Sequence, residues 1–217
     1  MLKPEAQKFW DAPEFERQKV LIVGSTPWEI SERAAAHDRE LLETPLTKEY
    51  LKTLKAPTVV ELGCGVGRVL KEFLNDYRCI GLDISKNMLT KAKEYLAGRS
   101  PTPAWLGPIE NGTLPVNDED ADFVYSFLVF QHIQTKAEIT KYMQEVSRVL
   151  RSGGYFRVQT HKGKPHPENK FGGFLGRFYP SLAAFKKELD GKYGMDVVEA
   201  QEGLVLAEWL WLTLRKR

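Results

Sequence analysis

The sequence predicts an α/β fold of three layers, in which a mostly parallel seven-stranded sheet lies between helices and ends in an antiparallel hairpin. Short apolar runs alternate with helical segments from residue 58 to residue 160, and this alternation indicates a parallel sheet covered on both faces. A glycine-rich turn follows the first run, as expected where a strand passes into a helix beside a ligand. Near the end of the chain, two apolar runs lie so close together that they must pair antiparallel.

The first 55 residues are expected to form an N-terminal helical cap. Residues 26–29 carry a capping-box pattern with proline at the first helical position, which predicts a helix to about Leu42. Thr47 is expected to cap a second helix from Lys48 to Leu54. Residues 56–217 then form the main domain, with a loop insertion at 161–180.

Strands and helices of the main domain are expected in regular succession. A helix at 181–189 precedes a hairpin around Gly203, and the pattern of Trp209 and Trp211 predicts a buried strand because it is apolar on both faces. The expected elements are 58–62, 68–75, 79–83, 86–96, 104–106, 123–127, 136–150, 154–160, 181–189, 196–200 and 204–214.

The composition is that of an ordinary globular chain. With 217 residues and a net charge of +2, it gives no reason to expect a nucleic-acid or membrane surface. No apolar stretch approaches the roughly 20 residues of a membrane span, and the first residues lack the apolar core of a signal peptide. Cys64 and Cys79 are expected to be reduced, packed thiols, and no metal site is expected. We therefore expect a cytoplasmic monomer or homodimer.

The run from Glu61 to Val69 is the most informative part of the chain. Gly63, Gly65 and Gly67 follow a buried strand, and glycines there allow a tight turn and admit a ligand against bare main chain. The next strand ends in Asp83, and an acid at that place can accept both ribose hydroxyls of an adenosine. These features predict a site for a nucleoside cofactor.

Two enzyme classes combine a glycine loop with an acid. Dinucleotide enzymes use G-x-G-x-x-G, in which a helix N-terminus faces a pyrophosphate. Here the spacing is G-x-G-x-G, with Glu61 two residues before the first glycine. An acid at this position would repel a pyrophosphate but suits a ligand with a free ammonium. The pattern therefore disfavours an NAD(P)-dependent oxidoreductase without excluding it.

Glu61-x-Gly63-x-Gly65-x-Gly67 and Asp83 together resemble the first two signature motifs of the class I S-adenosylmethionine-dependent methyltransferases, whose fold is Rossmann-like. The segments 83–89, 114–126 and 149–156 are similar to later parts of that family in the same order, so the resemblance covers about residues 55–214. It implies S-adenosylmethionine as the cofactor and a small-molecule acceptor that is methylated on O, N or C. A non-catalytic, cofactor-binding regulatory module and an aminopropyl-transfer enzyme of the same fold are also compatible with the pattern.

The resemblance also implies which residues bind the cofactor. Glu61 would hold the methionine ammonium through water or backbone, and Asp83 would bind the ribose. Pro108 stands where many members carry an acid for the adenine amino group, so Glu110 or Asn111 is expected there instead. The full set is Glu61, Gly63, Cys64, Gly65, Gly67, Arg68, Asp83, Ile84, Met88, Glu110, Asn111, Phe127 and Leu128.

No single catalytic residue has to be visible, because methyl transfer mostly requires proximity and orientation. Gln131 and His132 follow the fourth strand and are expected near the methyl group, and His161 follows the fifth strand. His132 either acts as a general base or forms local hydrogen bonds that shape the pocket. The segment 163–180 either closes as a lid or is a solvated excursion.

Two further groups have a functional and a structural interpretation. Trp10, Trp28 and Tyr50 either cap the cofactor or pack a small helical layer. The acidic run 118–120 is expected to belong to a turn rather than to a metal site.

Overall fold

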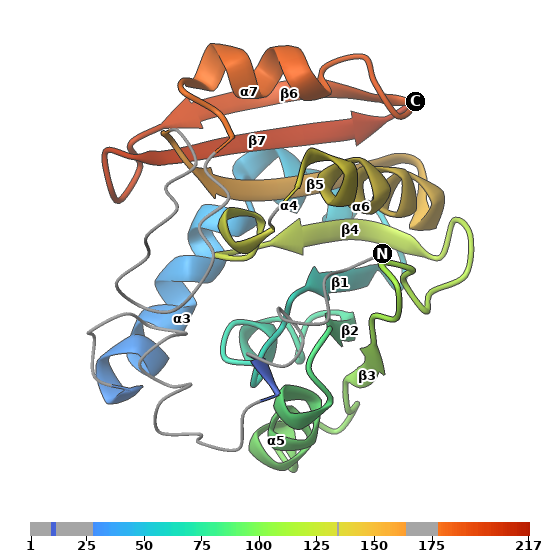
Figure 1. The fold of residues 1–217 in the computed structure, drawn as a ribbon. Coiled ribbons are helices and arrows are strands. Elements are labelled where there is room, and N and C mark those ends of the chain that lie inside the picture. Colours follow the sequence, from blue (N-terminus) through green and yellow to red (C-terminus); the bar gives the residue numbers. More distant parts are fainter. Residues whose placement is uncertain (1–9, 12–27, 134, 164–177) are drawn as a thin grey trace. The chain divides into compact units, whose positions relative to one another are not determined.

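The structure is a computed structural model that describes residues 10–11, 28–133, 135–163 and 178–217 (Figure 1). The chain divides into two compact units, an N-terminal unit of residues 2–111 and a C-terminal unit that begins at Gly112. The predicted helix start at residues 26–27 and most of the predicted loop insertion lie outside the described residues.

The N-terminal unit contains a parallel three-stranded part of the sheet together with its helices. Strand β1 pairs parallel with β2, and β2 pairs parallel with β3. Figure 1 shows α5 running beside β3, and the buried side of α5 includes Met88 and Leu89. The elements are α3 (Trp28–Leu42), α4 (Pro45–Lys52), β1 (Thr58–Leu62), the 3-10 helix η1 (Leu70–Glu72), β2 (Arg78–Asp83), α5 (Lys86–Leu96) and β3 (Trp105–Pro108).

The C-terminal unit contains the rest of the sheet and its antiparallel end. Strand β4 pairs parallel with β5, and β7 pairs antiparallel with both β5 and β6. Helices α6 and α7 accompany these strands (Figure 1). The elements are β4 (Ala121–Ser126), the 3-10 helix η2 (Phe130–His132), α6 (Lys136–Val149), β5 (Leu150–His161), α7 (Leu182–Leu189), β6 (Met195–Glu202) and β7 (Trp209–Lys216).

The predicted fold class is confirmed. The seven strands have the order β3-β2-β1-β4-β5-β7-β6, so that a mostly parallel sheet ends in an antiparallel pair. Trp211 on β7 is fully buried, as predicted for a strand that is apolar on both faces. Among the described residues, no helix has the length and apolarity that crossing a membrane requires.

Several element predictions were wrong in detail. The expected helix at 68–75 is a series of turns around η1, since Glu72, Phe73 and Leu74 donate to carbonyls three residues earlier instead of four. The second helix begins at Pro45 and is capped by Thr44, not by Thr47, because proline fits the first helical position. The last strand begins at Trp209 rather than residue 204.

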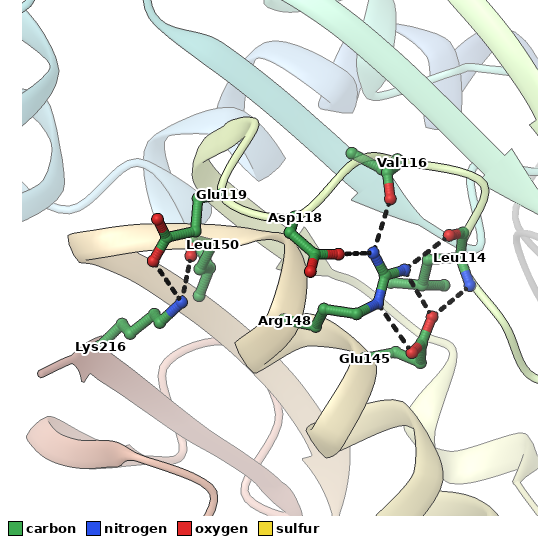
Figure 2. A network of polar contacts seen from close by, with 8 residues as sticks. All are labelled: Leu114, Val116, Asp118, Glu119, Glu145, Arg148, Leu150 and Lys216. Carbon is green, nitrogen blue, oxygen red and sulfur yellow. Dashed lines mark hydrogen bonds and ion pairs between the residues drawn. The ribbon is translucent and has the colours of Figure 1, made fainter.

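The residues of the acidic run 118–120 each pair with a basic side chain of the C-terminal unit. Asp118 lies 2.7 Å from Arg148, Glu119 3.2 Å from Lys216 and Asp120 3.6 Å from Arg151. Figure 2 shows the first two pairs as parts of one polar network that joins α6, β7 and the chain before β4. The run therefore has the structural role expected of a turn.

Candidate functional site

The glycine loop leaves β1 and turns back over the end of β2. The amides of Gly63 and Cys64 both donate to the Leu82 carbonyl, at 2.7 and 2.9 Å. Gly63, Gly65 and Gly67 have φ angles of 81°, 52° and 80°, and residues with a side chain adopt such angles only at an energetic cost. The shape of the loop explains why glycine stands at three alternate positions.

Asp83 is a buried carboxylate at the end of β2, and it is tied to the glycine loop. Its Oδ2 accepts a hydrogen bond from the Gly65 amide at 2.8 Å, and its Oδ1 accepts one from the Ser85 amide at 2.9 Å. Burial raises the pKa of Asp83 from 3.8 to about 6, although these backbone hydrogen bonds oppose the rise. The carboxylate is therefore ionised at neutral pH and can accept hydrogen bonds from hydroxyl groups.

The space around the glycines differs between positions. A Cβ added to Gly67 would lie 2.8 Å from Leu96 Cδ1, and one added to Gly81 would lie 2.7 Å from Leu70 Cδ2. A Cβ added to Gly65 would meet no atom within 4 Å. Gly67 and Gly81 thus serve close packing, whereas Gly65 leaves open space beside an ionised carboxylate. This combination fits a nucleoside with free ribose hydroxyls.

Other residues of this region have distinct surroundings. Glu61 is buried in β1, where it pairs in register with Gly81. Burial, together with the charges of Asp83 and Glu61, raises the pKa of the Cys64 thiol well above its usual value, so Cys64 is not a nucleophile at neutral pH. Arg68 donates to Asp38 at 2.5 Å and to the Ser31 carbonyl at 3.0 Å. Its guanidinium holds α3, and its contact with a cofactor stays a prediction.

The residues expected around an adenine lie in two places. Ile84 and Met88 lie just before and within the start of α5, and Glu110 and Asn111 follow β3. Met88 is buried on α5, and Ile84 is half-buried. Glu110 is exposed and forms an ion pair with Lys86 at 3.2 Å. Asn111 is exposed and has a φ of 52°. The adenine contacts of these four residues stay predictions.

In the C-terminal unit, the chain after β4 has a strained backbone at Leu128. Its φ is 60°, an uncommon value for a residue with a side chain and one that is found at functional sites. The Leu128 amide donates to Gln159 Oε1 on β5 at 3.1 Å. Phe127 stacks on Trp211 with 5.7 Å between ring centroids. These contacts fix the direction in which the segment leaves the strand.

Gln131 and His132 lie in the single turn of η2, just beyond this segment. Gln131 Nε2 and His132 Nε2 are 3.4 Å apart. Gln131 is buried, and its Oε1 has no hydrogen-bond partner among the described residues. His161 ends β5, with its ring 6.1 Å from that of Trp209. Since β4 and β5 are parallel neighbours, the predicted catalytic residues follow strands at the same edge of the sheet.

The sequence reasoning missed the contact between Ser85 and Asp11. The hydroxyl of Ser85 donates to Asp11 Oδ1 at 2.8 Å and accepts a hydrogen bond from the Met88 amide at 3.1 Å. A serine directly before a helical run is a capping signal, and this signal could have identified Ser85. Asp11 lies 74 residues away along the chain, and no local pattern relates the two.

Comparisons with known proteins agree with these motifs. Residues 60–158 match the model of a methyltransferase domain family. The chain is 29% identical over 185 residues to a probable S-adenosylmethionine-dependent methyltransferase of Mycolicibacterium smegmatis. This alignment covers 70% of this chain and 66% of that protein. It is 30% identical over 111 residues to the tRNA (carboxymethyluridine(34)-5-O)-methyltransferase ALKBH8 of Mus musculus. This second alignment covers 51% of this chain and 16% of that protein.

A solved structure supports the fold. Magnesium protoporphyrin IX methyltransferase from Synechocystis PCC 6803, with bound SAH, matches with a TM-score of 0.68 at 14% identity, over 97% of this chain and 98% of that one. The chain spans 66% and 16% of the lengths of the two curated relatives named above. Because one of these relatives is a tRNA methyltransferase, the expectation that no nucleic acid is bound is not supported.

Proposed function

We propose that this chain transfers a methyl group to an O, N or C nucleophile of a small-molecule acceptor. The reason is that it contains a class I S-adenosylmethionine-dependent methyltransferase domain. The observation that carries this proposal is the ionised Asp83 carboxylate beside the open space over Gly65. When bound, S-adenosylmethionine supplies a methyl group on a sulfonium, which is a good leaving group.

Three features of the N-terminal unit would hold this cofactor. Asp83 would accept hydrogen bonds from the ribose hydroxyls, each worth roughly 1.5–3 kcal/mol because the acceptor is charged. The absence of a side chain at Gly65 would let the cofactor lie against the main chain. The buried carboxylate of Glu61 would provide the negative charge for the methionine ammonium.

His132 is the residue proposed to act on the acceptor. An acceptor that arrives as a hydroxyl or an ammonium must lose a proton, and an imidazole can take it near neutral pH. The contact between Gln131 Nε2 and His132 Nε2 would hold the ring in one orientation. Such a base is unnecessary for an acceptor that is already deprotonated.

A small acceptor is favoured over RNA by the state of the basic side chains. The net charge is only +2, and several arginines are already paired with carboxylates, as in Arg68–Asp38, Arg148–Glu145 and Arg151–Asp122. Nucleic-acid binding relies on cations that are available to neutralise phosphates. The tRNA methyltransferase relative makes RNA the second candidate.

The test is transfer of a radioactive methyl group from S-adenosylmethionine. The protein is incubated separately with the low-molecular-weight fraction of a cell extract and with total RNA, and Asp83→Asn serves as the inactive control. We expect label in the small-molecule fraction only. Label in RNA alone would overturn the acceptor class but not the cofactor.

Once an acceptor is known, the base can be tested by itself. His132→Ala should lower turnover roughly a hundredfold, the usual effect of losing a general base, with no change in the Kd for S-adenosylmethionine. Near-normal turnover in this variant would assign His132 a local structural role instead.

A further inference from the structure

Residues 10 and 11 lie against the start of α5, directly beside Asp83. The Ser85 hydroxyl donates to the Trp10 carbonyl at 2.9 Å and to Asp11 Oδ1 at 2.8 Å. The side chain of Asn87 donates to the Asp11 carbonyl at 2.8 Å, and its amide lies 3.4 Å from Asp11 Oδ1. Asp11 therefore contacts α5 through both its carboxylate and its backbone.

Ser85 connects this contact to Asp83, the proposed acceptor for the ribose hydroxyls. It is fully buried and its hydroxyl caps α5 through the Met88 amide, while its own amide donates to Asp83 Oδ1 at 2.9 Å. A shift of Ser85 would therefore move both the start of the helix and one of the backbone amides that orient the Asp83 carboxylate. Another of these amides belongs to Gly65.

From these contacts we infer that Asp11 is a positioning residue for cofactor binding, which holds Ser85 and through it fixes the Asp83 carboxylate in the orientation that receives the ribose. This inference rests on the proposed role of Asp83. Residues 10 and 11 thereby become part of the cofactor site, although Asp11 itself need not touch the cofactor.

The charge of Asp11 gives this role a distinct signature. The Asp11 carboxylate contributes to the raised pKa of Asp83. Among the described residues, the charges of Asp83 and Glu61 also act on the Cys64 thiol in the glycine loop. Lys86, which follows Ser85 in the sequence, forms an exposed ion pair with Glu110. Removing the charge of Asp11 should lower the pKa of Asp83 and leave the affinity at pH 7.5 near normal, whereas general loosening of the fold would weaken binding at that pH as well.

Two variants of the full chain separate geometry from charge. Asp11→Ala removes one of the two acceptors of the Ser85 hydroxyl and leaves only the Trp10 carbonyl, and we expect it to weaken S-adenosylmethionine binding at pH 7.5 roughly tenfold. Asp11→Asn keeps an acceptor oxygen but removes the charge, so we expect near-normal affinity at pH 7.5 and a lower pH at which binding is half lost. Glu94→Ala, which removes an exposed acid from the same helix, is the matched control and should change neither quantity.

The affinities are measured by calorimetric titration between pH 5 and 8, after circular dichroism has shown that each variant is folded. The inference is overturned if Asp11→Ala binds like the wild type, or if Asp11→Asn leaves the pH of half-binding unchanged or raises it. These outcomes differ from failure of the proposed function, in which the wild type would not bind S-adenosylmethionine or Asp83→Ala would bind it normally.

Discussion

At the scale of single residues, the burial of the Asp83 carboxylate has an electrostatic cost. The residue is 8% exposed, and its carboxylate accepts hydrogen bonds from the backbone amides of Gly65 and Ser85, which offset only part of the loss of hydration. Its pKa of about 6 in the folded protein therefore exceeds the value of 3.8 for an unperturbed aspartate. A ligand that donates hydrogen bonds to this carboxylate stabilises the ionised form.

Cofactor binding should consequently weaken as the pH falls through about 6. Protonation of Asp83 removes an acceptor for the ribose hydroxyls, so the Kd for S-adenosylmethionine should rise between pH 7.5 and pH 5. Asp83→Asn should bind weakly, with little change over this range, and it controls for the titration of other groups. Titrations at four pH values check this, and a wild-type Kd that is constant down to pH 5 would contradict the ribose assignment.

The same pKa predicts an opposite effect on the stability of the cofactor-free protein. Because the folded state holds the proton more tightly than the unfolded state, this group stabilises the fold at low pH, and the contribution is lost as the pH rises from about 4 to about 6. The shift corresponds to roughly 3 kcal/mol. Urea unfolding should show this loss for the wild type relative to Asp83→Asn, whose unfolding free energy lacks the contribution.

The glycines allow a comparison in which folding and binding separate. Gly65 and Gly98 have φ angles of 52° and 71°, and an added Cβ would have no atom within 4 Å at either position. Alanine at either position should therefore cost about 1–2 kcal/mol of unfolding free energy for the backbone angle alone. Only Gly65→Ala should abolish S-adenosylmethionine binding, because its methyl group fills the space over the loop. Equal affinities of the two variants would show that the cofactor does not approach Gly65.

At the scale of elements, the arginine near the end of α6 holds the chain that leads into β4. Arg148 donates to the carbonyls of Leu114 and Val116 at 2.9 and 2.8 Å, and it pairs with Glu145 and Asp118 (Figure 2). Glu145 in turn accepts a hydrogen bond from the Leu114 amide at 2.8 Å. One side chain thus satisfies several polar groups of a segment without regular structure.

Arg148→Met should accordingly lower the unfolding free energy by about 2–4 kcal/mol, because it leaves two carbonyls and two carboxylates without their donor. Lys141→Met removes an exposed cation from the same helix and should change stability by less than about 0.5 kcal/mol. Urea unfolding of both variants compares them directly. A loss of the same size in the two would mean that the network of Figure 2 contributes nothing beyond general charge.

At the scale of the whole molecule, most of the fold could be predicted because local patterns determine it. The alternation of apolar runs and helices indicated the parallel strands, and the short connection at Gly203 indicated the antiparallel pair. The helix expected at 68–75 failed because its apolar residues fit either a helix or packed turns, and the backbone here follows the glycine loop into 3-10 hydrogen bonds.

The candidate site was predictable only where one motif contains its residues. The three glycines and Asp83 lie at strand ends that sequence patterns mark. The glycines have positive φ angles and Gly65 donates to Asp83, and their role in cofactor binding stays a prediction. The contact of Asp11 with Ser85 and the engagement of Arg68 by Asp38 join residues that are far apart along the chain. Such pairings depend on tertiary structure, and a single sequence does not encode them as a local pattern.

The most direct measurement is calorimetric titration of the protein with S-adenosylmethionine, S-adenosylhomocysteine and NADH, with Asp83→Asn as the control. We expect saturable binding of both sulfur nucleosides by the wild type, none of NADH, and strongly weakened binding by the variant. Binding of NADH alone, or equal binding of S-adenosylmethionine by wild type and variant, would contradict the assignment of the glycine loop and Asp83 as the cofactor site.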